Sequence, residues 1–189
     1  MYHPKENKDL KFHYNGKELE IVEEFTYLGV KFTNKGISKE AVLARIIPSQ
    51  KSMFATLSNC KASNIPIDLV LELFDKIVMP CMLYGGEVFG FKNITVLERL
   101  QLKYAKYALN LKSSTPTCMV YGETGYLPVE YYVKIKMINF WIFLISSRQD
   151  KLSFKLYNIC LLLYQKKSLK FEWLAFIEKT LKALYSEST

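Results

Sequence analysis

The stretch EEFTYLGVKFTNKG, residues 23–36, separates two different hydrophobic patterns in the chain. Its first part alternates large apolar residues with polar or small ones, which is typical of a strand. The alternating residues are Phe25, Tyr27, Val30 and Phe32. We expect this strand to stop at Asn34-Lys35-Gly36, where turn-forming residues cluster. Beyond Gly36 the apolar residues recur at helical spacing, so the stretch predicts the passage from a β element to a helical body.

The segment before this stretch predicts a hairpin. In LKFHYNGKELEIV, residues 10–22, Asn15-Gly16 lies between two alternating segments. This dipeptide suits a type I′ turn, because both of its residues tolerate positive φ. Residues 10–33 together are therefore expected to form a small antiparallel sheet with a third strand over 25–32.

The rest of the chain predicts helices. They are expected over 38–60 with an interruption or kink at Pro48, from Ile65-Pro66 with Val70, Leu73, Phe74 and Ile77 buried, and over 93–111, 128–147, 150–165 and 169–185. Thr115-Pro116 and Gly125 are expected to bracket a short turn-rich piece, and Phe140, Trp141 and Phe143 to lie in the core. The fold class is thus mainly α: a helical bundle-like domain preceded by a small N-terminal antiparallel β element.

Three regions are expected along the chain. They are an N-terminal β segment (1–37), a helical region (38–148) and a basic helical C-terminal region (149–189), with a soft boundary at 148–151.

The composition favours an anionic partner. The chain has 189 residues and a net charge of +8, and residues 131–189 carry ten basic against four acidic side chains. Such an excess favours nucleic acid over a membrane surface, although a lysine-rich solvated surface is the alternative. The 23 lysines against three arginines suit phosphate neutralisation better than the reading of bases.

The cysteines and the apolar segments indicate an intracellular protein of the nucleus or cytoplasm. Cys60, Cys81, Cys118 and Cys160 lie far apart without a CxxC motif, so they are expected to be buried thiols rather than zinc ligands. The N-terminus lacks the apolar core of a signal peptide. The run at 137–145 is too short to cross a bilayer, and a buried helix is expected there.

The sequence does not predict a catalytic centre. Two-metal phosphoryl transfer needs converging carboxylates, and the four aspartates are scattered. Asp68, Glu72 and Asp75 share a helix face, which is expected to be solvated. With no phosphate-binding loop either, we expect no cofactor, no metal and no enzymatic activity of this chain alone.

Three segments, in order, carry a resemblance. NGKELEIVEEFTYLGVKFTNKGISKEAVLARI (15–46) resembles the segment after the catalytic palm in reverse transcriptases of non-LTR (LINE-type) retrotransposons. LFDKIVMPCMLYGGEVFG (73–90) is similar to the family's Val-x-Pro-x-Leu-Tyr-Gly-x-Glu-x-Trp-Gly segment. LERLQLKYAKYALNL (97–111) with STPTCMVYGETGYLPVE (114–130) is similar to the region that follows in the family. The resemblance covers about residues 10–148.

The resemblance implies the end of a palm, a thumb and the region after it. The family's catalytic Asp-Asp motif is absent and would lie upstream, so a missing palm domain is an implied partner. The chain departs from the family pattern at Phe89, where Trp is usual, at the extra Gly86 and at Pro48. We therefore expect a non-catalytic reverse transcriptase fragment that binds the template–primer backbone. The alternative is a decayed or domesticated retroelement remnant acting as a helical protein-interaction module.

The candidate nucleic-acid-binding residues lie on and beside the helix at 93–111. They are Lys92, Arg99, Lys103, Lys106 and Lys112. The spacing i, i+4, i+7 places Arg99, Lys103 and Lys106 on one side of the helix, and a solvated helix side is the alternative. A smaller share is expected from Lys134, Lys136 and the basic C-terminal region. Tyr104 and Tyr107 are expected to pack in the core, with base stacking as the alternative.

Overall fold

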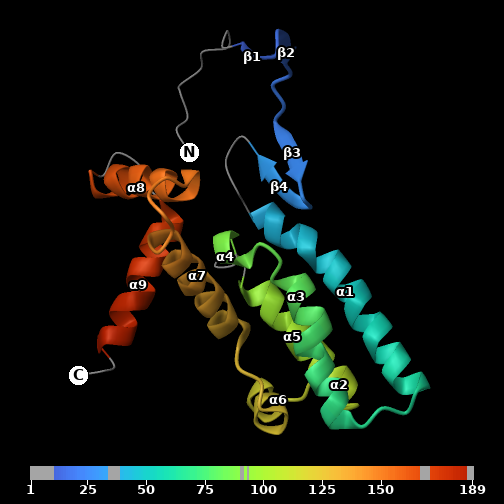
Figure 1. Cartoon of the computed structure of the whole chain (residues 1–189). Coiled ribbons are helices and arrows are strands. Elements are labelled where there is room, and N and C mark those ends of the chain that lie inside the picture. The colour runs from blue at the N-terminus through green and yellow to red at the C-terminus, as the bar shows by residue number, and fades with distance from the viewer. Residues whose placement is uncertain (1–10, 34–38, 90–91, 93, 167–170, 187–189) are drawn as a thin grey trace.

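The computed structural model describes residues 11–33, 39–89, 92, 94–166 and 171–186, and it is mainly helical (Figure 1). Two small β-hairpins precede the helices and lie at one end of the helical body. The predicted fold class, mainly α with an N-terminal antiparallel β element, is therefore confirmed.

The first hairpin forms where Asn15-Gly16 predicts it. Strand β1 (Phe12–Tyr14) pairs antiparallel with β2 (Lys17–Leu19). Both turn residues have positive φ, 49° at Asn15 and 75° at Gly16. These angles match a two-residue I′ turn, which suits the twist of a hairpin.

The second hairpin corrects the prediction of a single strand over 25–32. Strand β3 (Glu24–Tyr27) turns back at Leu28-Gly29 into β4 (Val30–Thr33). Leu28 has φ of 47°, a region that leucine rarely occupies, so its side chain gives no turn signal. Gly29 has φ of 76°, in the left-handed region that glycine adopts without steric cost, so this position of the turn favours glycine.

The two hairpins are separate two-stranded sheets rather than one sheet. Residues of β1, β2 and β3 are exposed, whereas those of β4 are half-buried. Val30 contacts the hydrophobic core, and β4 lies against α1, so β4 anchors the second hairpin. The expected end of the strand at Asn34-Lys35-Gly36 lies outside the described residues.

The helices follow in chain order. They are α1 (Lys39–Ala62), α2 (Ile67–Leu73), the π-helical turn η1 (Phe74–Val78), α3 (Met79–Met82), α4 (Gly86–Phe89), α5 (Ile94–Ala108), α6 (Thr117–Thr124), α7 (Val129–Ile145), α8 (Leu152–Gln165) and α9 (Glu172–Ser186). Figure 1 shows α1, α3 and α5 side by side, with α7 beyond them and α8 and α9 at the far side. Residues 117–124, expected as a turn-rich piece, form α6, which ends at Gly125 in the left-handed region.

Helix α1 continues through Pro48, so the predicted interruption is wrong. A proline inside a helix removes one backbone hydrogen bond and normally destabilises it. Here the helix is held on both sides of the proline by buried side chains, Val42 before it and Met53 after it. Tertiary packing therefore outweighs the local cost.

The π-helical turn η1 changes which residues of this helix reach the core. Val70 and Phe74 are buried as predicted, but Ile77 is exposed and Val78 is buried in its place. Within η1 the amide of Met79 donates to the carbonyl of Phe74, five residues back. This wider turn inserts one residue relative to α-helical spacing and shifts the buried position from 77 to 78.

Two tyrosine hydroxyls bind the backbone just before η1. The Tyr104 hydroxyl donates to the carbonyl of Val70 at 2.5 Å, and the Tyr126 hydroxyl donates to the carbonyl of Leu71 at 2.6 Å. Both tyrosines also pack on the ring of Phe74, with centroids 4.9 Å and 5.5 Å away. Side chains from α5 and from the α6–α7 loop therefore stabilise the irregular turn.

Helix α7 is less buried than its composition predicts. Its buried residues are Val129, Val133, Met137 and Leu144. Trp141 and Phe140 are half-buried, and Phe143 is 52% exposed, so placing all three aromatics in the core was wrong for Phe143. The indole Nε1 of Trp141 donates to the Tyr157 hydroxyl at 2.9 Å, which joins α7 to α8.

The last helix, α9, packs on the same hydrophobic core as the helices before it. A turn lies at 148–151, where the soft boundary is expected. Beyond it Ile177 of α9 belongs to the core cluster. The indole of Trp173 also donates to the carbonyl of Glu87 at 2.7 Å, which attaches α9 to α4.

The four cysteines are free thiols, but only Cys60 is buried. Cys81 and Cys160 are half-buried and Cys118 is exposed, so the prediction of four buried thiols was wrong for these three. Each packs according to its place on its helix rather than as part of a cluster.

Candidate nucleic-acid interface

Helix α5 separates its residues into a buried face and a basic face. The buried residues are Leu97, Leu100, Gln101, Tyr104 and Ala105. Gln101 is held by its amide Nε2, which donates to the carbonyl of Leu127 at 3.1 Å. This packing fixes the rotation of α5, so the residues on its other face point away from the core.

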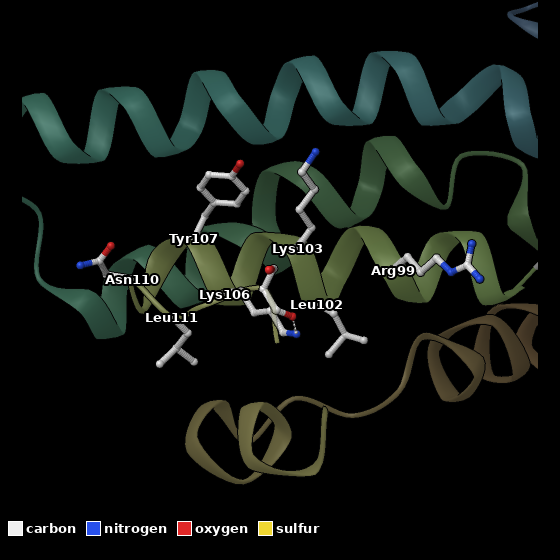
Figure 2. A pocket seen from close by; sticks show the side chains of 8 residues that line it. Arg99, Leu102, Lys103, Lys106, Tyr107, Asn110 and Leu111 are labelled. Carbon is white, nitrogen blue, oxygen red and sulfur yellow. Dashed lines mark hydrogen bonds between the residues drawn. The ribbon is translucent and has the colours of Figure 1, made fainter. Parts of the chain in front are cut away.

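The basic face of α5 lines an open groove of about 630 Å³. Its lining residues are Arg99, Leu102, Lys103, Lys106, Tyr107, Asn110, Leu111 and Ser113. Figure 2 shows these side chains fanning outward from α5, with Lys103 and Tyr107 directed toward α1 and Leu102 and Leu111 directed toward the side of α6. The structure therefore brings together three predicted residues, Arg99, Lys103 and Lys106. Among the described residues, no aspartate or glutamate lines this groove.

Each of the three cations has a different environment. Arg99 is exposed. Lys106 is half-buried and its Nζ donates to the carbonyl of Ser113 at 2.7 Å, which leaves further donors of its ammonium group for an external acceptor. Lys103 is half-buried, and its Nζ lies 4.9 Å from the Phe54 ring centroid and 6.0 Å from that of Tyr107.

The other two predicted residues lie outside the groove. Lys92 is partly buried, and its Nζ forms an ion pair with Glu172 at 2.6 Å, which joins the segment before α5 to the start of α9. Its charge is therefore already matched. Lys112 is exposed in the loop after α5, where its carbonyl accepts a hydrogen bond from the amide of Thr115 at 3.1 Å.

The residues expected to make smaller contributions lie on α7. The Nζ atom of Lys134 forms an ion pair with Glu130, one turn earlier, at 2.7 Å. Lys136 is exposed and lines a different cavity, beside the second hairpin. Neither side chain lines the α5 groove.

A second open groove, of about 610 Å³, adjoins the first near the C-terminal end of α5. It is lined by Phe54, Leu57, Ser58, Cys60, Lys61, Asn64, Ile65, Ile67, Val70, Tyr107, Ala108 and Asn110. Tyr107 and Asn110 line both grooves.

The prediction that Tyr104 and Tyr107 both pack in the core holds for Tyr104, which is fully buried, but is wrong for Tyr107, which is 59% exposed.

The sequence did not identify Phe54 as a site residue. Its ring lies 5.7 Å from that of Tyr107 at an angle of 84°, although Phe54 belongs to α1 and Tyr107 to α5. No local motif indicates this pairing, because it depends on how the two helices pack. The sequence carries no signal for the role of Phe54, because neither its exposure nor its contact with Tyr107 can be read from the residues around it.

The acidic residues of α2 and η1 do not form a metal site. Asp68 and Glu72 are exposed as expected, whereas Asp75 is half-buried and its Oδ1 has no hydrogen-bond partner. Burial raises the pKa of Asp75 and nearby Glu72 raises it further, while Lys76 lowers it. Within the described ranges, no three His, Cys, Asp or Glu side chains gather in a way that could hold a metal ion.

The groove's neighbouring carboxylate has a structural role. Glu98 of α5 accepts a hydrogen bond from the amide of Val129 at 2.7 Å, at the first turn of α7. Burial raises the pKa of Glu98, and this hydrogen bond opposes the effect. Glu98 therefore joins α5 to α7. Its carboxylate is engaged by the amide of Val129 rather than by the neighbouring Arg99.

Comparison with protein-family models, with curated proteins and with solved structures finds no match for this chain. In the part of the chain that the structure describes, no helix combines the length and the apolar character needed to span a membrane.

Proposed function

We propose that the chain binds the backbone of duplex nucleic acid through the basic face of α5, as the non-catalytic, thumb-like part of a LINE-type reverse transcriptase. The observation that carries this proposal is the shared position of Arg99, Lys103 and Lys106 in one open groove without a lining carboxylate among the described residues. The family assignment rests on the resemblance of residues 10–148.

The spacing along α5 suits a phosphate backbone. At about 1.5 Å rise per residue, Arg99 and Lys106 are separated by roughly 10 Å along the helix axis. A duplex strand carries one phosphate per about 3.4 Å of its axis, so roughly three phosphates of one strand lie within that span. The three cations can therefore follow consecutive or near-consecutive phosphates.

The residue types favour binding without sequence preference. Lysine neutralises phosphate as a point charge and does not require a particular base edge. Arg99 adds a fork of donors that can bind two oxygens of one phosphate. We therefore expect similar affinity for duplexes of different sequence.

The experiment is a titration of the protein with a labelled RNA–DNA duplex at several salt concentrations. Phosphate neutralisation releases counterions, with a slope of log K against log salt near −0.9 per contact on a B-form duplex. Contacts from Arg99, Lys103 and Lys106 predict a slope of about −3, and Lys112 would bring it to about −4. Affinity that does not depend on salt would contradict the proposal.

We also expect no primer extension by this chain alone. The resemblance places the catalytic carboxylates of the family outside these residues, and the carboxylates of α2 and η1 do not converge on a shared site. Metal-dependent extension by the purified chain would show that a catalytic centre exists here.

A second candidate function, a helical protein-interaction module, is favoured by α8. This helix has no fully buried residue, and one side of it carries exposed apolar residues at helical spacing. They are Leu152, Leu156, Ile159 and Leu162, which are 70%, 51%, 53% and 55% exposed. An apolar stripe of this kind is typical of a helix that docks in a partner's groove. If this were the main function, Leu156→Gln would abolish partner binding, and duplex binding would be absent in the wild type.

A further inference from the structure

We propose that Tyr107 and Phe54 form a stacking site for an unpaired base, so that the chain prefers a duplex with a single-stranded overhang to a blunt duplex. This inference rests on the proposed function, because it takes the α5 groove as the site of the duplex backbone. It adds a ligand class, a duplex–single-strand junction, that the basic face alone does not specify.

The first observation is the exposure of the two rings. Tyr107 is 59% exposed and Phe54 is 43% exposed. Tyr104, three residues before Tyr107 on α5, is fully buried and binds the carbonyl of Val70. An exposed ring beside a phosphate-binding surface is typical of proteins that stack single-stranded bases.

The second observation is the position of Tyr107 between two grooves of different character. The groove on the Arg99 side carries the basic side chains of α5. The groove on the α1 and α2 side contains apolar residues such as Leu57 and Ile65, together with Asn64 and Asn110. A backbone held in the first groove would thus bring its next nucleotides to an apolar surface with side-chain amides, which can bond to base edges.

The third observation is that the rings are held in place. The Phe54 and Tyr107 rings meet edge to face, with centroids 5.7 Å apart. The Nζ atom of Lys103 lies 4.9 Å from the Phe54 centroid and 6.0 Å from that of Tyr107. The cation lies over Phe54, so Phe54 serves to orient Tyr107 through the edge-to-face contact, and Tyr107, the more exposed ring, is the one on which a base stacks.

Lys61 extends the basic surface beyond the rings. It is exposed near the end of α1 and lines the second groove. A single strand passing over Tyr107 would reach Lys61 with its next phosphates, so the path has charge at both ends and aromatic rings between them. This order of groups fits a duplex end that continues as one strand.

The test measures binding of three labelled probes by fluorescence anisotropy. The probes are a blunt RNA–DNA duplex, the same duplex with an overhang of about four nucleotides, and the same overhang with abasic sites in place of bases. We expect the intact overhang to bind at least about five-fold tighter than the blunt duplex, the lower end for one base–aromatic stack. The abasic overhang keeps its phosphates, so we expect it to bind close to the blunt duplex once its added charge is allowed for by salt titration.

For each variant we compare its affinity for the overhang duplex with its affinity for the blunt duplex. A change in binding of the duplex backbone affects both affinities equally and cancels in their ratio. Tyr107→Leu should bring this ratio close to one, and Tyr107→Phe should preserve it because the ring remains. Tyr131→Leu is the matched control: Tyr131 is 52% exposed on α7 and lines neither groove.

Equal affinities for the intact and abasic overhangs would overturn the stacking site and leave duplex binding standing. An unchanged ratio in Tyr107→Leu would also overturn it. Salt-independent binding of the blunt duplex, with the overhang preference retained, would instead contradict the proposed function alone. Failure of all three probes to bind would overturn both.

Discussion

The Nζ atom of Lys103 lies 4.9 Å from the centroid of the Phe54 ring, so a cation of α5 rests against an aromatic ring of α1. A contact of this kind at an exposed site contributes about 0.5–1 kcal/mol. It places a positive charge and two exposed rings on one surface formed by helices that are distant in sequence. The proposals for the duplex backbone and for an unpaired base both depend on this surface.

Replacing Tyr104 by Phe should destabilise the fold by about 1–3 kcal/mol, because it leaves the buried carbonyl of Val70 without its hydroxyl donor. Thermal or urea unfolding measures the loss. Tyr107→Phe removes the same hydroxyl from an exposed ring of the same helix and should change stability little. Equal effects of the two variants would contradict the role of Tyr104 at the π-helical turn.

Asp75→Asn should stabilise the protein more at neutral pH than at acid pH. Burial raises the pKa of Asp75 in the folded state above the ordinary value of 3.8, which applies to the unfolded state. At pH values between the unfolded-state pKa and the raised folded-state pKa, the folded state therefore binds more protons than the unfolded state. The free energy of unfolding of the wild type therefore falls as the pH rises through this window and stays lower above it. Asparagine does not titrate, so the free energy of unfolding of the Asp75→Asn variant does not fall in this way. Urea unfolding of both proteins from about pH 3 to about pH 7 measures the difference, and a difference that does not vary with pH would contradict this reasoning.

Trp141→Ala should destabilise the protein by about 3 kcal/mol, the lower end for such a truncation, because the indole is only half-buried. The change also removes the hydrogen bond to Tyr157, which loosens α8 from α7. Phe143→Ala is the matched control on the same helix, since Phe143 is 52% exposed, and it should cost much less. The melting temperatures of the two variants compare them directly, and an equal drop would place Phe143 in a buried contact.

Much of the fold was predictable because its signals are local. Apolar periodicity predicts α5, α7 and α9 to within a few residues, and Asn15-Gly16 predicts the first hairpin with its turn angles. The second hairpin was not predictable, because Leu28 takes a positive φ that its side chain does not favour. The shift of burial from Ile77 to Val78 also has no local signal, since it follows from a π-helical turn held by Tyr104 and Tyr126.

The candidate site was predictable only in part, for the same physical reason. The i, i+4, i+7 spacing correctly places Arg99, Lys103 and Lys106 together, because it depends on one helix alone. Lys92 lies close in sequence, yet it pairs with Glu172 of α9, a contact between segments far apart in the chain. The exposed pair of Phe54 and Tyr107 likewise depends on how α1 and α5 pack.

Lys92→Gln should leave the salt dependence of duplex binding unchanged, because the ion pair with Glu172 already matches this charge. Its partly exposed setting also limits the loss of stability to about 1 kcal/mol or less. This variant removes one positive charge from the protein, so it is the charge-matched control for a single replacement on α5 such as Arg99→Gln. A slope that becomes shallower by about 0.9 would place Lys92 among the phosphate contacts.

The most direct test of duplex binding by α5 is the salt dependence of a variant in which Arg99, Lys103 and Lys106 are all replaced by Gln. These side chains line an open groove and are not part of the buried core, so the variant should fold, as its circular dichroism spectrum and melting temperature will show. The expected result is a slope of log K against log salt shallower by about three contacts, or roughly 2.7, with weaker binding at every salt concentration. A folded triple variant that binds the duplex with the affinity and slope of the wild type would contradict binding by this face of α5.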